Sequence, residues 1–276
     1  MPELPEVEVI CRGLRPELCG RRLARVALGD KPLRQSSSPR ELAQWLPGRK
    51  LERLCRRGKY LVFRFEGHVT LVIHLGMTGR LWLDHQLAPL PHVHAVFTWE
   101  GGLIMAFQDV RRFGSILIFP PKAPVQPLKA LGREPFSRKT TPEWLQAQAR
   151  GRSRPIKNLL LDGRFLAGLG NIYACEALWA AGIHPATPAG QLTLKEWQKL
   201  LREIRRLLRR AICRGGTTIN DYLNSKGETG LFQLELAVYG REGDPCRRCG
   251  ESIARQVQAG RSSFFCPRCQ PRHPTE

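Results

Sequence analysis

The first residues of the chain place a proline beside a carboxylate. Met1 is followed by Pro2 and Glu3, and removal of Met1 would leave Pro2 as an N-terminal secondary amine. Such an amine can attack an aldehyde-like carbon and form an iminium, as lysine does in Schiff-base catalysis. A carboxyl group one residue away can donate or relay a proton. Proline at position 2 is common, however, and by itself it indicates only that the initiator methionine is removed.

The residues that follow have a simpler structural explanation. Pro5, Glu6 and Glu8 suit the first turn of a helix, where proline has the right backbone angle and the helix dipole favours carboxylates. Apolar residues then recur at helical spacing, so we expect a helix from Pro5 to about Leu18. This helix does not explain the proline and glutamate that precede it.

Four of the nine cysteines are grouped near the C-terminus in two C-x2-C pairs. The pairs are Cys246 with Cys249, and Cys266 with Cys269. Two such knuckles can place four thiolates tetrahedrally around one Zn²⁺, whereas disulfides are disfavoured inside a cell. A closed shell of four thiolates leaves no open position for catalysis, so the sequence predicts one structural zinc. The alternating residues and the glycine between the pairs favour a β-hairpin.

Composition narrows the class of protein and favours a polyanionic partner. The chain has 276 residues, of which 42% are hydrophobic, so it can bury a core. We find neither a secretory signal nor a stretch apolar enough to span a bilayer, and we expect a soluble intracellular protein. Lysine and arginine number 44 against 24 acidic residues, and they cluster. Such an excess is typical of nucleic-acid-binding proteins, with general solubility as the alternative.

The elements that must position these residues change character along the chain. From about residue 22 to 119, β-branched and aromatic runs cut by glycine turns predict the hairpins of a sandwich or barrel. The proline-rich segment 120–127 has the composition of a linker. Beyond it, Thr193 and Glu196 predict a capping box for a helix that ends before Gly215. One face of that helix is basic, which solvation and direct DNA contact explain about equally well.

Several further motifs follow one another in a fixed order. They are PELPEVE at the N-terminus, Gly58-Lys59-Tyr60-Leu61, His74–Gly79, Asp109–Gly114, Leu160–Tyr173, Gly215–Thr218, Val238–Arg241 and the cysteine pairs. Together they resemble the bacterial formamidopyrimidine-DNA glycosylase family over essentially the whole chain. Each motif alone is of moderate specificity, whereas the complete set in family order is highly specific.

The resemblance implies an α+β fold and a domain organisation. Residues 1–120 would form an N-terminal β-sandwich with a leading helix, and 121–135 a linker. Residues 136–236 would form a helix–two-turn–helix domain, and 237–276 a zinc-binding β-hairpin. Double-stranded DNA would lie in a basic cleft between the two main domains of a monomer. A bacterial, cytoplasmic and nucleoid-associated location is also implied.

The resemblance further implies an enzyme of base-excision repair. Members of the family excise oxidised purines, chiefly 8-oxoguanine and formamidopyrimidines, and then cut the strand as AP lyases. Pro2 would attack C1′ of the flipped nucleotide, Glu3 would move protons, and Lys59 would act as a proton donor near the lesion. β-Elimination followed by δ-elimination would cleave the DNA. Without the resemblance, Lys59 is an ordinary lysine at the start of a strand.

Flipping a base leaves a hole in the stack, and three residues match those with which the family fills it. Met77 and Phe113 can wedge between base steps, and Arg111 can hydrogen-bond the orphaned partner base. Further residues match family positions that contact DNA, and they are His74, His92, Lys157, Asn171 and Tyr222, with Arg261 placed among the catalytic residues. Ordinary packing is the simpler explanation for Met77 and for both histidines.

One position departs from the family and leaves the range of lesions open. Asn220 stands where the family often has a basic residue, in the loop with which the family closes over the damaged base. One alternative is an endonuclease VIII-like enzyme that removes oxidised pyrimidines, and another is a non-catalytic zinc-hairpin protein that binds damaged DNA. Leu4 and the complete gap-filling set favour the purine branch. The intact catalytic residues argue against a non-catalytic protein.

Overall fold

The computed structural model describes residues 2–86, 90–216 and 235–272. The chain divides into two compact units, which we call the N-terminal unit (Met1–Lys129 with Ile212–Gln233) and the C-terminal unit (Ala130–Ala211 with Leu234–Glu276). Among the described residues, no helix has the length and apolar character needed to cross a membrane.

Two β-sheets make up most of the N-terminal unit. The first is antiparallel, in the order β1-β7-β8-β6, and its strands are β1 (Leu23–Leu28), β6 (Arg80–Asp84), β7 (Val93–Trp99) and β8 (Ile104–Gln108). The second has the order β2-β9-β5-β4-β3, with β2 and β9 parallel and the other pairs antiparallel. Its strands are β2 (Gln35–Ser36), β3 (Leu51–Arg57), β4 (Tyr60–Phe65), β5 (Val69–His74) and β9 (Ser115–Phe119).

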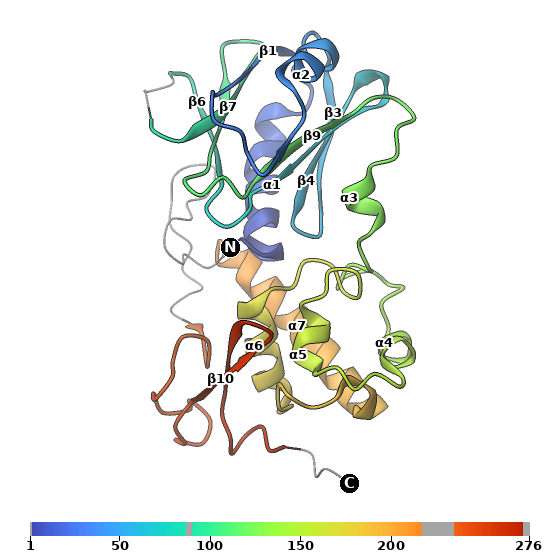
Figure 1. The fold of residues 1–276 in the computed structure, drawn as a ribbon, viewed down its shortest axis with the longest axis vertical. Helices are drawn as coiled ribbons and strands as arrows, with labels where there is room; N and C mark the ends of the chain where they lie inside the picture. The colour runs from blue at the N-terminus through green and yellow to red at the C-terminus, as the bar shows by residue number, and fades with distance from the viewer. Residues whose placement is uncertain (1, 87–89, 217–234, 273–276) are drawn as a thin grey trace. The chain divides into compact units, whose positions relative to one another are not determined.

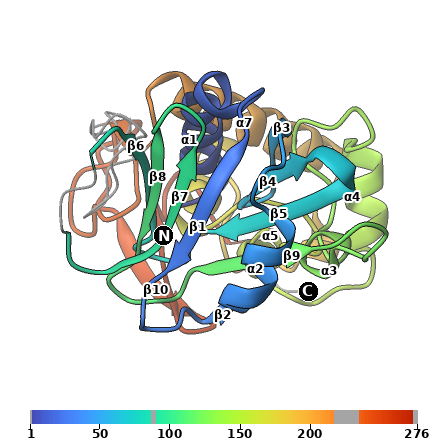
Figure 2. The same cartoon turned by 90° about the horizontal axis from the view of Figure 1, so that it is seen from above.

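The inward-facing residues of both sheets form one core. Phe65 of β4 and Trp99 of β7 come from different sheets, and their rings stack with centres 6.0 Å apart. Both side chains are almost completely buried in the same apolar cluster. The strands of the two sheets form two separate groups in Figure 2. The predicted β-sandwich is therefore confirmed.

Helix α1 (Leu4–Leu18) is the leading helix of this unit. Glu3 and Glu6 form its capping box, in which the Glu6 carboxylate accepts the Glu3 backbone N–H at 2.8 Å. The box satisfies backbone donors that a helix start leaves unpaired. The apolar face of α1 is buried and contacts β3, β4 and β6, which belong to both sheets (Figure 1). The predicted helix is thus confirmed and begins one residue earlier.

Two short helices of this unit were not predicted. Helix α2 (Pro39–Trp45) has Ser38 as its N-cap. The Ser38 side chain accepts the Glu41 N–H at 3.2 Å in a second capping box. Helix α3 (Gln126–Lys129) overlaps the end of the segment whose composition predicted a linker. A four-residue helix of this kind gives little signal because its pattern is shorter than two turns.

The C-terminal unit combines helices with a two-stranded hairpin. Its helices are α4 (Pro142–Ala149), α5 (Ile156–Leu160), α6 (Asn171–Ala181) and α7 (Leu194–Cys213, in this unit up to Ala211), and the hairpin consists of β10 (Ala254–Gln258) and β11 (Arg261–Phe265). The predicted capping box of α7 is present, with the Thr193 N–H 2.8 Å from the Glu196 carboxylate. The helix ends at Cys213, just before Gly215, as predicted.

The basic face of α7 is partly used within the C-terminal unit. Arg205 donates hydrogen bonds to the carbonyls of Pro135, Ser137 and Thr140 at 2.7–3.1 Å. The guanidinium of Arg209 lies 5.5 Å from the centre of the Phe136 ring. These two arginines therefore anchor the segment that precedes α4. This role is different from both explanations suggested by the sequence, which were solvation and direct DNA contact.

Candidate nucleic-acid interface and metal centre

Pro2 and Glu3 lie at the first turn of α1, and both are buried. Gly216, with φ of 84°, packs against this turn. A Cβ atom at Gly216 would lie 3.0 Å from Oε1 of Glu6, tighter than nearly all real side-chain contacts. The glycine therefore allows the chain to pass directly against Glu6, whose carboxylate accepts the Glu3 N–H. Met1 itself lies outside the described residues.

Lys59 occupies the second position of a two-residue turn between β3 and β4. Arg57 pairs with Tyr60 across the hairpin, and Gly58 has φ of 58° at the first turn position. A two-residue turn with positive φ at its first position favours glycine there, because most other residues are strained in that conformation. This turn fixes the direction in which Lys59 leaves the hairpin, next to the strand β4 that pairs with β5.

His74 ends β5 and lies opposite Tyr60 in the adjacent strand. Burial, followed by the positive charges of Lys59 and Arg34, lowers the pKa of His74 from 6.5 to about 4. Nδ1 of His74 accepts the Gly76 N–H at 3.0 Å, so the single proton of the neutral ring resides on Nε2. A neutral histidine in this tautomer can donate one hydrogen bond to a phosphate oxygen.

Two loops, 75–79 and 109–114, lie against each other, and we call them the paired loops. Asp109 is completely buried and joins them. Its carboxylate accepts the Thr78 hydroxyl from the first loop and, at 2.7 Å, the Gly114 N–H from its own loop. A Cβ atom at Gly76 would lie only 2.5 Å from backbone atoms of the second loop, so the two backbones are in direct contact.

The three predicted gap-filling residues all lie on the paired loops. Met77 is 40% exposed and Phe113 is 42% exposed, which is unusual for large apolar side chains. The guanidinium of Arg111 lies 4.8 Å from the centre of the Phe113 ring. Arg111 and Phe113 also line a hollow of about 470 Å³. His92 is exposed, and its carbonyl accepts the Asp109 N–H at 3.0 Å.

In the C-terminal unit, Lys157 and Asn171 both donate hydrogen bonds to strand β11 of the β10–β11 hairpin. The Lys157 ammonium is completely buried and donates to the Ser262 carbonyl at 2.9 Å and to the Ser263 hydroxyl at 2.6 Å. The Asn171 amide donates to the same Ser262 carbonyl at 2.9 Å. Burial lowers the pKa of Lys157, and the positive charge of Arg261 lowers it further. Three predicted site residues, Lys157, Asn171 and Arg261, are thus brought together.

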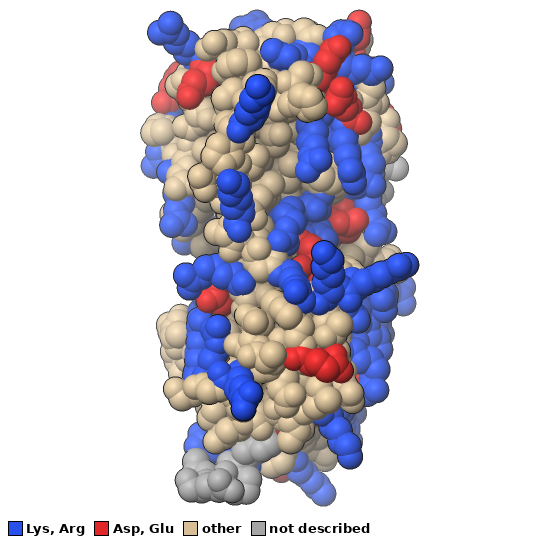
Figure 3. Space-filling view, turned by 90° about the vertical axis from the view of Figure 1, so that its right-hand side faces the viewer, with Lys and Arg blue, Asp and Glu red and all other residues tan. Residues whose placement is uncertain are grey.

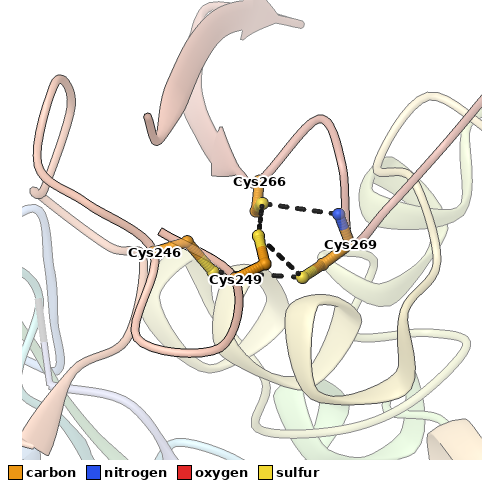
Figure 4. Close-up of side chains that lie close together, drawn as sticks. All are labelled: Cys246, Cys249, Cys266 and Cys269. Carbon is orange, nitrogen blue, oxygen red and sulfur yellow. Dashed lines mark hydrogen bonds between the residues drawn. The ribbon is translucent and has the colours of Figure 1, made fainter. Parts of the chain in front are cut away.

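The four grouped cysteines converge on one point, which Figure 4 shows. Their Sγ atoms all lie within 4.8 Å of one another. Sγ of Cys249 is 3.5 Å from that of Cys266 and 3.4 Å from that of Cys269. Four thiolates around Zn²⁺ at about 2.3 Å lie about 3.8 Å apart in a tetrahedron, so the cluster fits this ion. None of these four cysteines forms a disulfide.

Glu176 holds a distant backbone segment in place, and no motif in the sequence marks it. It lies on α6, is almost completely buried, and accepts three backbone N–H groups, from Ala237, Val238 and Tyr239, at 2.8–2.9 Å. Its signal in the sequence is a single carboxylate within an otherwise apolar helix. Its three partners lie more than sixty residues away, which no local pattern reveals. Tyr222 and Asn220 lie outside the described residues.

Three family profiles match consecutive parts of the chain. Residues 1–116 match the Formamidopyrimidine-DNA glycosylase N-terminal domain, and residues 131–222 match the Formamidopyrimidine-DNA glycosylase H2TH domain. Residues 243–272 match the Zinc finger found in FPG and IleRS. The third match covers the four cysteines that converge in the structure.

Individual relatives are similar over their full length. Formamidopyrimidine-DNA glycosylase of Cupriavidus pinatubonensis is 43% identical, over 98% of this chain and 100% of its own. The crystal structure of MutM (Fpg) from Thermus thermophilus superposes with a TM-score of 0.88 at 41% identity, over 99% of this chain and 100% of its own. A Lactococcus lactis Fpg in complex with DNA containing an abasic site superposes with a TM-score of 0.89 at 34% identity, over 98% and 100%.

Proposed function

This chain belongs to the formamidopyrimidine-DNA glycosylase family, and we propose that it excises oxidised purines from double-stranded DNA and then cleaves the strand as an AP lyase. The observation that supports this most directly is the full-length match to a glycosylase of that name at 43% identity. All three family domains follow in order along the chain. Because its proposed substrate is double-stranded DNA, we place its action at the bacterial nucleoid.

We assign the covalent chemistry to Pro2. After Met1 is removed, the Pro2 nitrogen forms a bond to C1′ of the damaged nucleotide, and the bond from C1′ to the base breaks. Protonation of the ring oxygen O4′ then breaks the C1′–O4′ bond and opens the sugar to an iminium, which acidifies the 2′ hydrogens. β-Elimination and then δ-elimination release the sugar from both neighbouring phosphates. Glu3 adjoins Pro2 and would carry protons to and from the sugar. Lys59 would act as a proton donor near the damaged base.

The paired loops supply the residues that replace a flipped base. Met77 and Phe113 are held partly in solvent by backbone contacts and by Asp109, so neither must leave a core in order to enter DNA. Insertion of such apolar side chains compensates for the cost of unstacking, which is about a few kcal/mol. Arg111, beside the Phe113 ring, would hydrogen-bond the orphaned base.

Contacts with the DNA backbone would come from both units. His74 offers its Nε2–H from the N-terminal unit, and the exposed Arg261 would serve from the C-terminal unit. Lys157 and Asn171 would contribute by holding the strand that carries Arg261, because both donate to the Ser262 carbonyl. Basic side chains are far more common than acidic ones on the face drawn in Figure 3. Cys246, Cys249, Cys266 and Cys269 hold one structural zinc, which braces the hairpin that carries Arg261.

An excision assay tests this proposal and separates it from its rivals. Duplexes carrying 8-oxoguanine opposite cytosine, a formamidopyrimidine, an oxidised pyrimidine or an abasic site are incubated with the protein, and released bases and strand breaks are measured. We expect excision of both purine lesions with cleavage at the same positions. Preference for the oxidised pyrimidine would favour the endonuclease VIII-like interpretation. Binding without any excision or cleavage would contradict an enzymatic function.

A further inference from the structure

An ion pair within the N-terminal unit involves Glu8, which the covalent chemistry does not use. Glu8 lies on α1, about two turns or less from Pro2, and its side chain is only 17% exposed. One carboxylate oxygen accepts Nε of Arg12 at 2.9 Å, and the other accepts Nε of Arg56 at 2.9 Å. Burial opposes ionisation of Glu8, but hydrogen bonds from the two arginines outweigh it and lower its pKa.

The two arginines differ in what else they can hold. Arg12 is 59% exposed and one turn along the same helix, so its pair with Glu8 stays within α1. Arg56 is 9% exposed and lies on β3, 48 residues away in the sequence. Its Nη1 also donates to the carbonyl of Gly58 at 2.9 Å. Arg56 therefore links α1 directly to the turn that carries Lys59.

Anchoring α1 to the sheet does not by itself require this link. Arg15, further along the helix, already donates to the carbonyl of Leu54 on β3 at 2.9 Å. The buried apolar face of α1 adds packing against the same strand. What Arg56 adds to these contacts is a hydrogen bond to the carbonyl of the turn residue that precedes Lys59.

We propose that the Glu8–Arg56 pair is a positioning device that fixes the Gly58-Lys59 turn relative to the start of α1, and so sets Lys59 against Pro2 and Glu3. This inference rests on the proposed function, because it assigns Arg56 a role that acts through Lys59. Misplacement of a reacting group by about 1 Å can slow a reaction about a hundredfold. A fork of two directed N–H bonds on a buried guanidinium is suited to that precision.

Matched substitutions of the two arginines test the proposal. Arg56→Gln removes the link to the turn, whereas Arg12→Gln removes the other partner of the same carboxylate and leaves the link in place. We expect Arg56→Gln to lower kcat for 8-oxoguanine excision by about ten- to a hundredfold with KM changed less than about threefold. Cleavage at a ready-made abasic site, which depends on Pro2, should fall less. Arg12→Gln should leave both rates within about twofold.

A double-mutant cycle shows whether Arg56 acts through Lys59. In a Lys59→Met background, we expect Arg56→Gln to change the excision rate by less than about twofold, because the group that it positions is gone. Equal, multiplicative effects of Arg56→Gln in both backgrounds, or equal losses on both substrates, would show a general structural role and overturn the proposal. If Arg56→Gln does not fold, Arg56→Lys takes its place in the cycle, since it keeps the charge and loses the fork.

The wild-type protein separates failure of this inference from failure of the proposed function. If wild-type protein and Arg12→Gln excise no lesion, the proposed function is wrong, and the inference falls with it. If both excise 8-oxoguanine and a folded Arg56→Gln excises it equally fast, only the positioning role is wrong. Thermal unfolding of each variant, measured at the assay pH, identifies rates that are low merely because the protein is unfolded.

Discussion

His74 shows at the scale of single residues how burial and neighbouring charge decide a protonation state. Its folded-state pKa of about 4 lies below the ordinary value of 6.5. As the pH falls from about 6.5 to 4, the unfolded chain binds a proton at this residue that the folded protein does not bind. The free energy of unfolding therefore falls with decreasing pH through this window.

The first prediction follows from this direction of the pH dependence of the unfolding free energy. Replacing His74 with glutamine, which can still accept the Gly76 N–H, should reduce the loss of stability between about pH 7 and about pH 5. Urea denaturation at both pH values measures it, with His85→Gln, an exposed position, as the control. The same pH dependence in wild type and in His74→Gln would show that burial of this ring is not the cause.

The sequence could identify site residues only where a motif or local chemistry marked them. Pro2, Glu3 and the four cysteines carry chemistry in their own types and spacing, and the resemblance added Lys59 and the gap-filling set. Residues that organise the site have no such mark. Asp109 reaches Thr78 across 31 residues and Glu8 reaches Arg56 across 48, and only the folded chain brings these partners together.

At the scale of elements, helices with strong end signals were predicted best. The limits of α1 and α7 follow from their capping residues and their buried stripes, whereas α2 was missed although Ser38 and Glu41 form a capping box. Its seven residues bury only Leu42, so hydrophobic periodicity gives almost no signal. Periodicity also could not show that Arg205 would bind backbone carbonyls.

The second prediction concerns the paired loops as one element. Asp109→Asn keeps the volume but turns one acceptor into a donor that faces the Thr78 hydroxyl or the Gly114 N–H. We expect a loss of about 1–3 kcal/mol in unfolding free energy. Excision of 8-oxoguanine should fall about tenfold or more, because Met77, Arg111 and Phe113 lose their fixed geometry.

Cleavage of a ready-made abasic site provides the internal comparison for Asp109→Asn. An abasic sugar carries no base to flip, so its cleavage should fall less than excision does. Asp84→Asn is a suitable control, because Asp84 is exposed and its side chain accepts the N–H groups of its neighbours His85 and Gln86. Equal losses on both substrates would indicate that Asp109 supports folding alone.

The third prediction, at the scale of the whole molecule, is that zinc is required for DNA binding and not for the N-terminal unit. The hairpin buries little apolar surface, and the four thiolates supply much of what holds it. A strong chelator should release one zinc per chain, raise amide exchange in 246–269, and abolish tight duplex binding. Exchange in the strands of the N-terminal unit should not change. Retained binding by zinc-free protein would contradict the role of the hairpin.

The fourth prediction follows from the net charge of +20. Duplex affinity should fall steeply with salt, by about 10³ or more between about 50 and 200 mM if about six or more phosphates are contacted. Fluorescence anisotropy with undamaged and lesion-containing duplexes measures the slope of log affinity against log salt concentration. Arg261→Gln should reduce the slope by about one phosphate contact, and a flat salt dependence would contradict binding through phosphates.

Borohydride trapping tests the central claim, that the N-terminal amine of Pro2 attacks damaged DNA, more directly than any other measurement. The protein is incubated with a duplex containing 8-oxoguanine opposite cytosine and reduced, and the adduct is located by mass spectrometry, with Pro2→Gly and an intact-mass check for loss of Met1 beside it. We predict a covalent adduct on Pro2 in protein that lacks Met1. An adduct on a lysine, or none on a duplex that Met1-free protein binds, would contradict the account.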